Sequence, residues 1–304
     1  MKKQLLPAYG YITLVICLGV ALSAEGTVCY VNGESTAANP DGSSWAKAYK
    51  DLQSAVDAVA DQGGGEIWVA EGRYTRTKDP VLTMKEGVAL YGGFAGTETF
   101  RDQRDWEANQ SIIDGEDTRR CVKGSDDGVL DGFIVTGGYA AGSESSGGMF
   151  NYDSSPTVTN CTFTENRADS YGGGMYNHNS SPTVTNCSFT ENSAASYGGG
   201  MHNFNSSPTL TNCSFTKNRA DLFGGGMRNE NSSPTLTNCI FHENTATFGG
   251  GIWNENSSPE VIDCTFTKNM VDLHGGGIFN ENSSPTIMNC SFTENTADTS
   301  GGGV

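Results

Sequence analysis

The sequence has few basic residues, few histidines and few prolines. Lys and Arg together number 18 against 35 Asp and Glu, which gives a formal net charge of −17, and there are 4 His and 9 Pro among 304 residues. Phosphate binding depends on Lys and Arg, and an anionic membrane surface attracts the same residues. The acidic composition therefore argues against nucleic acid and against an anionic lipid surface as partners.

Apolar runs are also scarce, and the only long one lies near the N-terminus. Two lysines precede an apolar stretch at about 11–22, and small residues end it just before Glu25. The stretch is short for a membrane span, and this order of positive, apolar and small residues predicts a cleaved secretory signal at residues 1–24. We expect the mature chain to be secreted or displayed at the cell surface or outer membrane.

Glycine is abundant at 40 residues, and it recurs with cysteine and proline at a fixed period. The step is 26 residues, once 25, and a period of this size indicates a solenoid. Prolines stand at positions 156, 182, 208, 234, 259 and 285, cysteines at 161, 187, 213, 239, 264 and 290, and glycine triplets begin at 172, 198, 224, 249, 275 and 301. The shortened step falls just before the triplet at 249, where a loop tolerates a deletion better than a strand does.

Alternation within one repeat predicts which side chains point inward. Val184, Phe189 and Met201 alternate with polar neighbours, and Asn186 and Asn192 stand where corners are expected. Each repeat then forms three short strands and three corners, and like residues stack ~4.8 Å apart in successive turns. One unit is too small to bury a core, but stacked units bury one together. The sequence predicts an all-β, right-handed parallel β-helix.

The chain divides into three parts on this basis. Residues 1–24 form the signal, residues 25–153 an N-terminal cap with irregular first turns, and residues 154–304 the regular repeats, which we expect to be truncated at the C-terminus. A helical pattern of apolar residues from Trp45 to Val59 ends at a glycine run. This pattern predicts a helix that covers the open first turn.

The column of six cysteines shares its inward parity with phenylalanine. A buried cysteine behaves as a small hydrophobe, and side chains stacked in register point the same way, which disfavours disulfide geometry. We therefore predict free, buried thiols. No two cysteines of the column stand two to four residues apart, so the spacing fits no zinc site, and we expect neither a metal nor a cofactor.

Several motifs resemble a known family. They are Gly-Glu-Ile-Trp-Val-Ala-Glu-Gly-Arg-Tyr at 65–74, Tyr-Gly-Gly-Phe-Ala-Gly-Thr at 91–97, and Gly-Gly-Gly-Met or Gly-Gly-Gly-Ile with Phe-x-x-Asn in each repeat. They resemble bacterial right-handed β-helix surface proteins, in particular chlamydial polymorphic outer-membrane-protein repeats, and the pectate-lyase-like β-helix superfamily. The resemblance implies a surface adhesin with a polysaccharide or cell-surface ligand. Membrane association would then require a C-terminal anchor beyond this sequence.

Two aromatic stripes flank the glycine triplets. The residues that we hypothesise to contact a ligand are Tyr171, Tyr176, Tyr197, Phe223, Phe248, Trp253 and Phe279. They recur once per turn, a spacing close to one sugar unit, and neighbouring glycines would leave the ring faces open. The alternative interpretation is ring stacking that stiffens the turns.

A catalytic site is less well supported by the sequence. Glycoside hydrolysis requires two positioned carboxylates, and the sequence offers only Asp126–Asp127 and a loose group formed by Asp114, Asp131 and the arginines at 119 and 120. We predict no catalytic residue and favour a non-enzymatic scaffold or adhesin. The alternative is a polysaccharide lyase or glycoside hydrolase of the pectate-lyase-like type.

Overall fold

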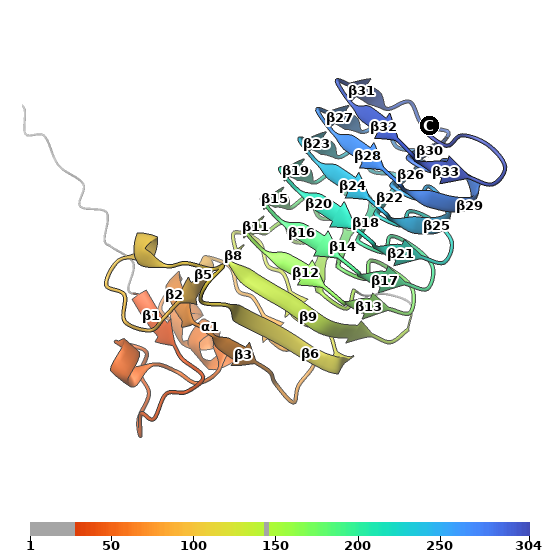
Figure 1. Ribbon diagram of the computed structural model, residues 1–304. Coiled ribbons are helices and arrows are strands. Elements are labelled where there is room, and N and C mark those ends of the chain that lie inside the picture. The colour runs from red at the N-terminus through yellow and green to blue at the C-terminus, as the bar shows by residue number, and fades with distance from the viewer. Residues whose placement is uncertain (1–27, 143–145) are drawn as a thin grey trace, which may run out of the picture.

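The computed structural model describes residues 28–142 and 146–304, so the expected signal at 1–24 lies outside the described residues. The described chain winds into a parallel β-helix whose turns stack along one axis (Figure 1). A single α-helix, α1 (Leu52–Ala60), and the 3-10 segments η1 (Trp45–Lys47) and η2 (Arg101–Gln103) lie in the N-terminal part. The predicted fold class is confirmed.

Three sheets run the length of the helix, and all of their strand pairs are parallel. The first sheet has ten strands: β1 (Val28–Val31), β2 (Gly65–Ala70), β5 (Val88–Phe94), β8 (Val129–Asp131), β11 (Thr157–Thr159), β15 (Thr183–Thr185), β19 (Thr209–Thr211), β23 (Thr235–Thr237), β27 (Glu260–Ile262) and β31 (Thr286–Met288).

The second sheet has fifteen strands, and β9 turns a corner so that it pairs on both sides of it. Its strands are β3 (Gly72–Tyr74), β6 (Ser111–Arg119), β9 (Phe133–Ala140), β12 (Thr162–Thr164), β13 (Arg167–Ala168), β16 (Ser188–Thr190), β17 (Ser193–Ala194), β20 (Ser214–Thr216), β21 (Arg219–Ala220), β24 (Ile240–His242), β25 (Thr245–Phe248), β28 (Thr265–Thr267), β29 (Met270–His274), β32 (Ser291–Thr293) and β33 (Thr296–Ala297).

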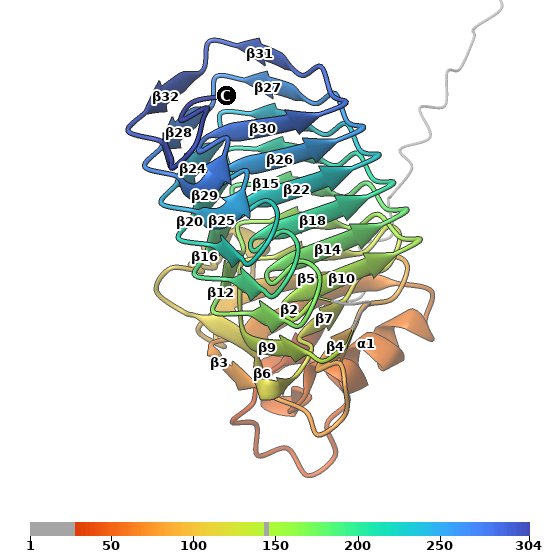
Figure 2. The same ribbon diagram turned by 90° about the vertical axis from the view of Figure 1, so that its right-hand side faces the viewer.

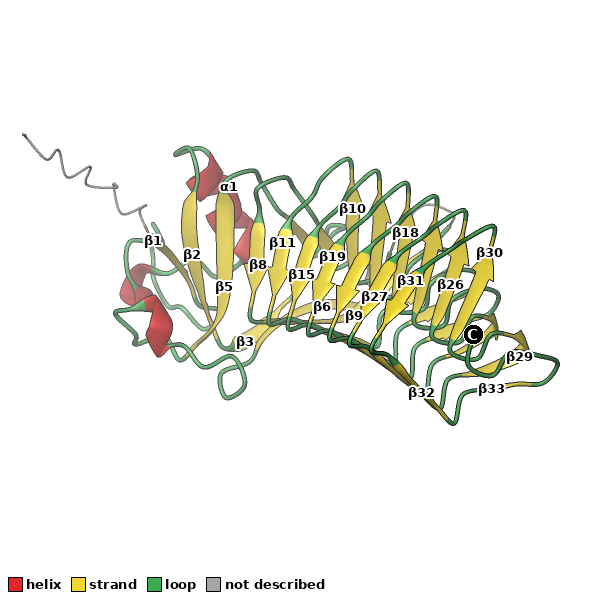
Figure 3. Cartoon of the chain, turned by 90° about the horizontal axis from the view of Figure 1, so that it is seen from above, coloured by secondary structure: helices red, strands yellow, loops and turns green. Residues whose placement is uncertain are grey.

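The third sheet has eight strands and is seen face-on in Figure 2. They are β4 (Leu82–Thr83), β7 (Val122–Lys123), β10 (Met149–Tyr152), β14 (Met175–His178), β18 (Met201–Phe204), β22 (Met227–Glu230), β26 (Ile252–Glu255) and β30 (Ile278–Glu281). Viewed from above, the turns follow one another away from α1, which lies in the N-terminal part (Figure 3).

Each regular turn contains four strand segments, not the three expected from alternation. The extra strand is the two-residue segment Arg167–Ala168 and its equivalents in other turns, which lie where we had expected a loop. It forms because a small apolar residue of this segment, such as Ala168 or Ala194, points inward and is nearly inaccessible. The same residue of the next turn pairs with it in register.

The core consists of stacked like residues. Phe163, Phe189 and Phe215 are fully buried, with ring centroids 4.9 and 4.7 Å apart and nearly parallel planes. The cysteines of the repeats are free thiols, as predicted, and all but Cys290 are buried.

The corners differ in one detail from the expectation. Asn186 adopts a left-handed backbone with φ 53°, as expected of an Asn corner, but the second left-handed corner is Glu191, with φ 57°. Asn192 follows that corner with its side chain fully buried. Its amide is needed for hydrogen bonds inside the turn, so the neighbouring residue takes the strained conformation.

The predicted helix is shorter than its apolar pattern. It begins at Leu52 because the side chain of Asp51 accepts a hydrogen bond of 2.9 Å from the backbone N–H of Ser54 and so caps the first turn. Trp45 lies in η1 before that cap. The helix packs against β1 and β2 in the N-terminal part of the solenoid.

Candidate functional site

The outer face of the third sheet carries two parallel rows of side chains. In each strand from β10 onward the first and third residues contribute to the interior, while the second and fourth point outward. Parallel pairing in register aligns them. The second-position row is Phe150, Tyr176, His202, Arg228, Trp253 and Phe279, and the fourth-position row is Tyr152, His178, Phe204, Glu230, Glu255 and Glu281.

A third row comes from the segment before each glycine triplet. We call Tyr171, Tyr197, Phe223, Phe248 and His274 the loop row. Gly172, directly after Tyr171, has φ 56°, and a Cβ there would lie 2.2 Å from the backbone oxygen of Met175. Only glycine fits this tight turn. The turn folds the ring of Tyr171 back over the sheet, 5.4 Å from the ring of Tyr176.

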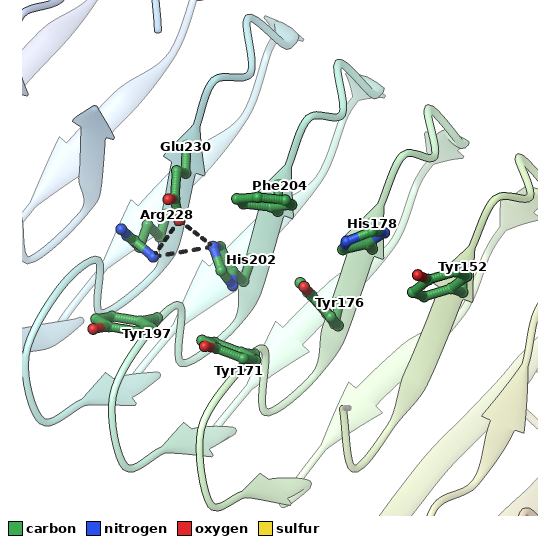
Figure 4. Close-up of a pocket in the computed structure, with 9 residues that line it drawn as sticks. All are labelled: Tyr152, Tyr171, Tyr176, His178, Tyr197, His202, Phe204, Arg228 and Glu230. Carbon is green, nitrogen blue, oxygen red and sulfur yellow. Dashed lines mark hydrogen bonds and ion pairs between the residues drawn. The ribbon is translucent and has the colours of Figure 1, made fainter. Parts of the chain in front are cut away.

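A pocket of about 350 Å³ opens between these rows, and Figure 4 shows the nine residues that line it. Tyr176, His202 and Arg228 lie in the middle. The loop row borders them on one side and the fourth-position row on the other. The lining residues are Tyr152, Tyr171, Tyr176, His178, Tyr197, His202, Phe204, Arg228 and Glu230.

Arg228 is the centre of the charged part of the pocket. Its Nη1 lies 2.8 Å from Glu230 Oε2 and its Nη2 lies 2.6 Å from Glu255 Oε2. The face of the guanidinium lies over the ring of Tyr197, 4.1 Å from its centroid, in a cation–π contact. The side chain is 7% exposed, so these partners replace nearly all of its water.

His202 lies beside this guanidinium and is uncharged at neutral pH. Burial, with the nearby charge of Arg228 adding to it against the opposing effect of Glu230, lowers the pKa of His202 to about 4. Nη1 of Arg228 lies 3.3 Å from His202 Nε2. The same nitrogen lies 3.7 Å from Glu230 Oε2, so Nε2 faces both the guanidinium and the carboxylate. In turn, the contact with His202 and the charge of Arg228 lower the pKa of Glu230.

Polar atoms without a partner concentrate in this pocket. Among the described residues, five buried side-chain nitrogen and oxygen atoms have no hydrogen-bond partner. Three of them, His178 Nδ1, His202 Nδ1 and Arg228 Nε, belong to pocket residues. A buried polar atom without a partner costs about 1–3 kcal/mol, so their clustering requires an explanation.

The structure divides the residues that we hypothesised to contact a ligand. Tyr171, Tyr176 and Tyr197 line the pocket. The others lie outside it and pack on one another: Phe223 and Trp253 have ring centroids 4.4 Å apart, Trp253 and Phe279 4.5 Å, and Phe248 and Trp253 5.5 Å. Glycine neighbours do not leave the second-position row open, because the loop row covers Tyr176 and Trp253, which are 7% and 4% exposed.

Sequence reasoning missed most of the polar lining. A signal was present, because His202 and Arg228 interrupt an otherwise aromatic row, and His178 and Glu230 stand two residues after members of that row. The acidic residues weighed as catalytic are instead engaged locally. Asp114 pairs with Arg73, Asp131 lies 2.7 Å from Arg104, and Asp126 accepts a hydrogen bond from Ser155.

Within residues 28–142 and 146–304, no group of three or more His, Cys, Asp or Glu side chains is placed to hold a metal ion. In the same part of the chain, no helix has the length and apolarity that a membrane crossing requires.

Solved structures similar to this chain are carbohydrate-active enzymes by name. The pectin methylesterase from Aspergillus niger aligns with a TM-score of 0.52 at 14% identity, over 91% of this chain and 90% of that chain. Pectate lyase Pel9A aligns with a TM-score of 0.47 at 12% identity, over 86% and 78% of the two chains. The alignment with the methylesterase, at 14% identity, shows a shared fold and no activity.

The sequence itself matches a family model for the right handed beta helix region at residues 107–231 and, in an overlapping match, 141–297. No curated protein matches it, and the narrower resemblance to chlamydial repeats finds no support. The two matches together span more than half of the chain. The protein therefore belongs to the right-handed β-helix family.

Proposed function

We propose that the protein binds a polysaccharide along the outer face of the third sheet, and that the pocket around His202 and Arg228 holds the sugar units that determine affinity. The observation that carries the proposal is the set of unpartnered buried atoms on His178, His202 and Arg228. Sugar hydroxyls both donate and accept, so they are suitable partners for such atoms.

The shape and lining of the pocket support the same function. Aromatic rings border it on both sides, and a few polar groups converge between them, an arrangement typical of ligand sites. Successive turns repeat at ~4.8 Å, so consecutive sugar units of an extended chain would meet equivalent positions on consecutive strands. With the expected secretory signal, this favours a secreted or surface protein that adheres to glycans.

Catalysis on the bound polysaccharide is the second candidate, and the fold shared with a pectin methylesterase favours it. A general acid in glycoside hydrolysis needs a carboxyl group with a raised pKa. The pKa of Glu230 is lowered instead, because His202 and the guanidinium of Arg228 lie beside this carboxylate. The chemistry of the pocket thus suits recognition better than bond cleavage.

A glycan array probed with residues 25–304, followed by calorimetric titration of each glycan that binds, tests the proposal. We expect Tyr171→Ala to weaken binding about fivefold or more, because stacked aromatic contacts contribute about 1 kcal/mol beyond their buried area. Phe248→Ala is the matched control, since it removes a half-buried ring of the same row outside the pocket. Equal affinity of wild type and Tyr171→Ala, or a similar loss in both variants, would contradict the proposed site.

The same glycans, incubated with the protein and analysed by mass spectrometry, separate the two candidates. Unchanged glycans support binding alone. Shortened chains, unsaturated ends or released methanol would establish catalysis.

A further inference from the structure

We infer that the pocket around His202 and Arg228 binds sugars without anionic groups and discriminates against uronates, an inference that rests on the proposed function. The reason is that the one arginine in the pocket is already occupied by two carboxylates of the protein itself, Glu230 and Glu255. The fold is shared with a pectin methylesterase, and pectin is rich in uronate, so fold and site point to different ligands.

Recognition of a sugar carboxylate commonly uses two parallel N–H groups of one arginine. In Arg228, Nη1 faces Glu230 at 2.8 Å and His202 at 3.3 Å, and Nη2 faces Glu255 at 2.6 Å. One face of the guanidinium is against Tyr197. Of the three guanidinium nitrogens only Nε lacks a partner, so a uronate could form two parallel hydrogen bonds with this arginine only by displacing a carboxylate that the fold holds beside it.

The local charge also disfavours an anionic ligand. Arg228 contributes one positive charge and its two glutamates contribute two negative ones, which leaves a net charge of −1. His202 adds none at neutral pH. Glu281 extends the fourth-position row by one more turn and is exposed. A polyuronate brings one carboxylate per sugar, so a unit bound beside Glu230 or Glu255 would meet a like charge, and the whole chain has a formal charge of −17.

An uncharged sugar encounters none of this repulsion. The carboxylate of Glu230, whose side chain is 24% exposed, can accept hydrogen bonds from sugar hydroxyls. The unpartnered nitrogens of His178 and His202 add further polar contacts, and Tyr152, which is 52% exposed, offers an aromatic surface for the C–H groups of the sugar. Hydrogen bonds to sugar hydroxyls require no net positive charge in the pocket.

The first experiment compares neutral and acidic glycans under identical low-salt conditions. The neutral set is xylan, galactan, mannan and β-glucan fragments, and the acidic set is polygalacturonate and alginate fragments. Fully methyl-esterified oligogalacturonate provides a matched pair with its free-acid form, because the sugars are the same and only the charge differs. We expect at least one neutral glycan to bind, with the free acids about tenfold weaker or worse.

The outcomes separate the inference from the proposed function. Strongest binding to a free uronate, with affinity that falls as NaCl is added, would overturn the inference and leave glycan binding intact. Absence of binding to both sets would overturn both.

A variant pair then isolates Arg228. Glu255→Gln removes the carboxylate on Nη2, so uronate affinity should rise about fivefold or more while neutral binding stays the same. Glu281→Gln changes the net charge equally but lies two turns from Arg228, so its gain should be smaller. Equal gains in the two variants would contradict the role of the occupied arginine.

Discussion

The side chain of Asn192 donates a hydrogen bond of 2.9 Å to the backbone oxygen of Phe163 in the preceding turn. Its amide oxygen accepts two further hydrogen bonds of 3.0 Å, one from the backbone and one from the side chain of Asn166. This arrangement repeats in each regular turn. A buried amide thus supplies the hydrogen bonds that the backbone cannot make where it turns a corner.

We therefore predict that Asn192→Ala lowers the free energy of unfolding by about 3 kcal/mol or more. The substitution leaves the buried backbone N–H of Asn166 without its partner, which costs about 1–3 kcal/mol, and it removes the further hydrogen bonds of Asn192 to the side chain of Asn166 and to the oxygen of Phe163, each worth about 1 kcal/mol. Urea denaturation followed by circular dichroism measures the change. Asn186→Gly is the control, because it preserves a left-handed, exposed corner and should cost much less. Equal losses of unfolding free energy in the two variants would contradict a stabilising role for the buried hydrogen bonds of Asn192.

The ion pairs of Arg228 lead to a second prediction. Arg228→Met removes a nearly buried cation and leaves Glu230 and Glu255 facing each other one turn apart. Removal of one partner of a buried pair commonly costs about 3 kcal/mol or more, and the partly exposed glutamates reduce this to about 2 kcal/mol. The triple variant Arg228→Met with Glu230→Gln and Glu255→Gln should recover most of the loss in thermal denaturation. A triple variant no more stable than Arg228→Met would contradict this account.

His202 makes stability depend on pH. Its pKa is about 4 in the folded protein and about 6.5 in an unfolded chain, so between these values the unfolded state binds more protons. The stabilisation is complete above pH 6.5 and is lost as the pH falls toward 4, by about 3 kcal/mol in total. The groups facing His202 are Arg228, Glu230, His178 and the ring of Tyr176. Of these, Glu230, with its own lowered pKa, loses stabilisation at still lower pH.

Urea denaturation at intervals from pH 7 to pH 4 measures this dependence. His202→Gln should flatten the slope, and His242→Gln, a half-exposed histidine on the second sheet, should not. A wild-type slope that survives in His202→Gln would assign the effect to other groups.

The cysteine column can be tested by alkylation. Five thiols of the column are buried and closed to reagents, so the native protein should resist iodoacetamide at Cys161, Cys187, Cys213, Cys239 and Cys264. Cys290 is half-buried and should be labelled first. Peptide mass spectrometry of unreduced protein, with and without guanidinium, provides the measurement. Disulfides between successive turns would refute the assignment of free thiols.

The amino-acid sequence by itself determined the solenoid. A 26-residue period with Val, Cys, Phe and Met at fixed offsets can bury these residues only if successive units pair in register, so the period implies parallel stacking. It also placed the cysteines inside and two rows of aromatic side chains on the same face. It did not reveal the fourth strand or that Glu191, not Asn192, takes the left-handed corner, because both depend on how small side chains and buried amides meet between turns.

Only the tertiary structure decided where the face is open. Phe223, Phe248, Trp253 and Phe279 are large enough to fill the space between the loop row and the sheet, and they pack together. Two turns earlier, the same positions hold His202 and Arg228, and the pocket forms there. The position of the pocket depends on the volumes and charges of side chains from adjacent turns, and these side chains meet only after the turns have stacked. A pattern along the chain can identify the rows, but it cannot show which contacts between them leave room for a ligand.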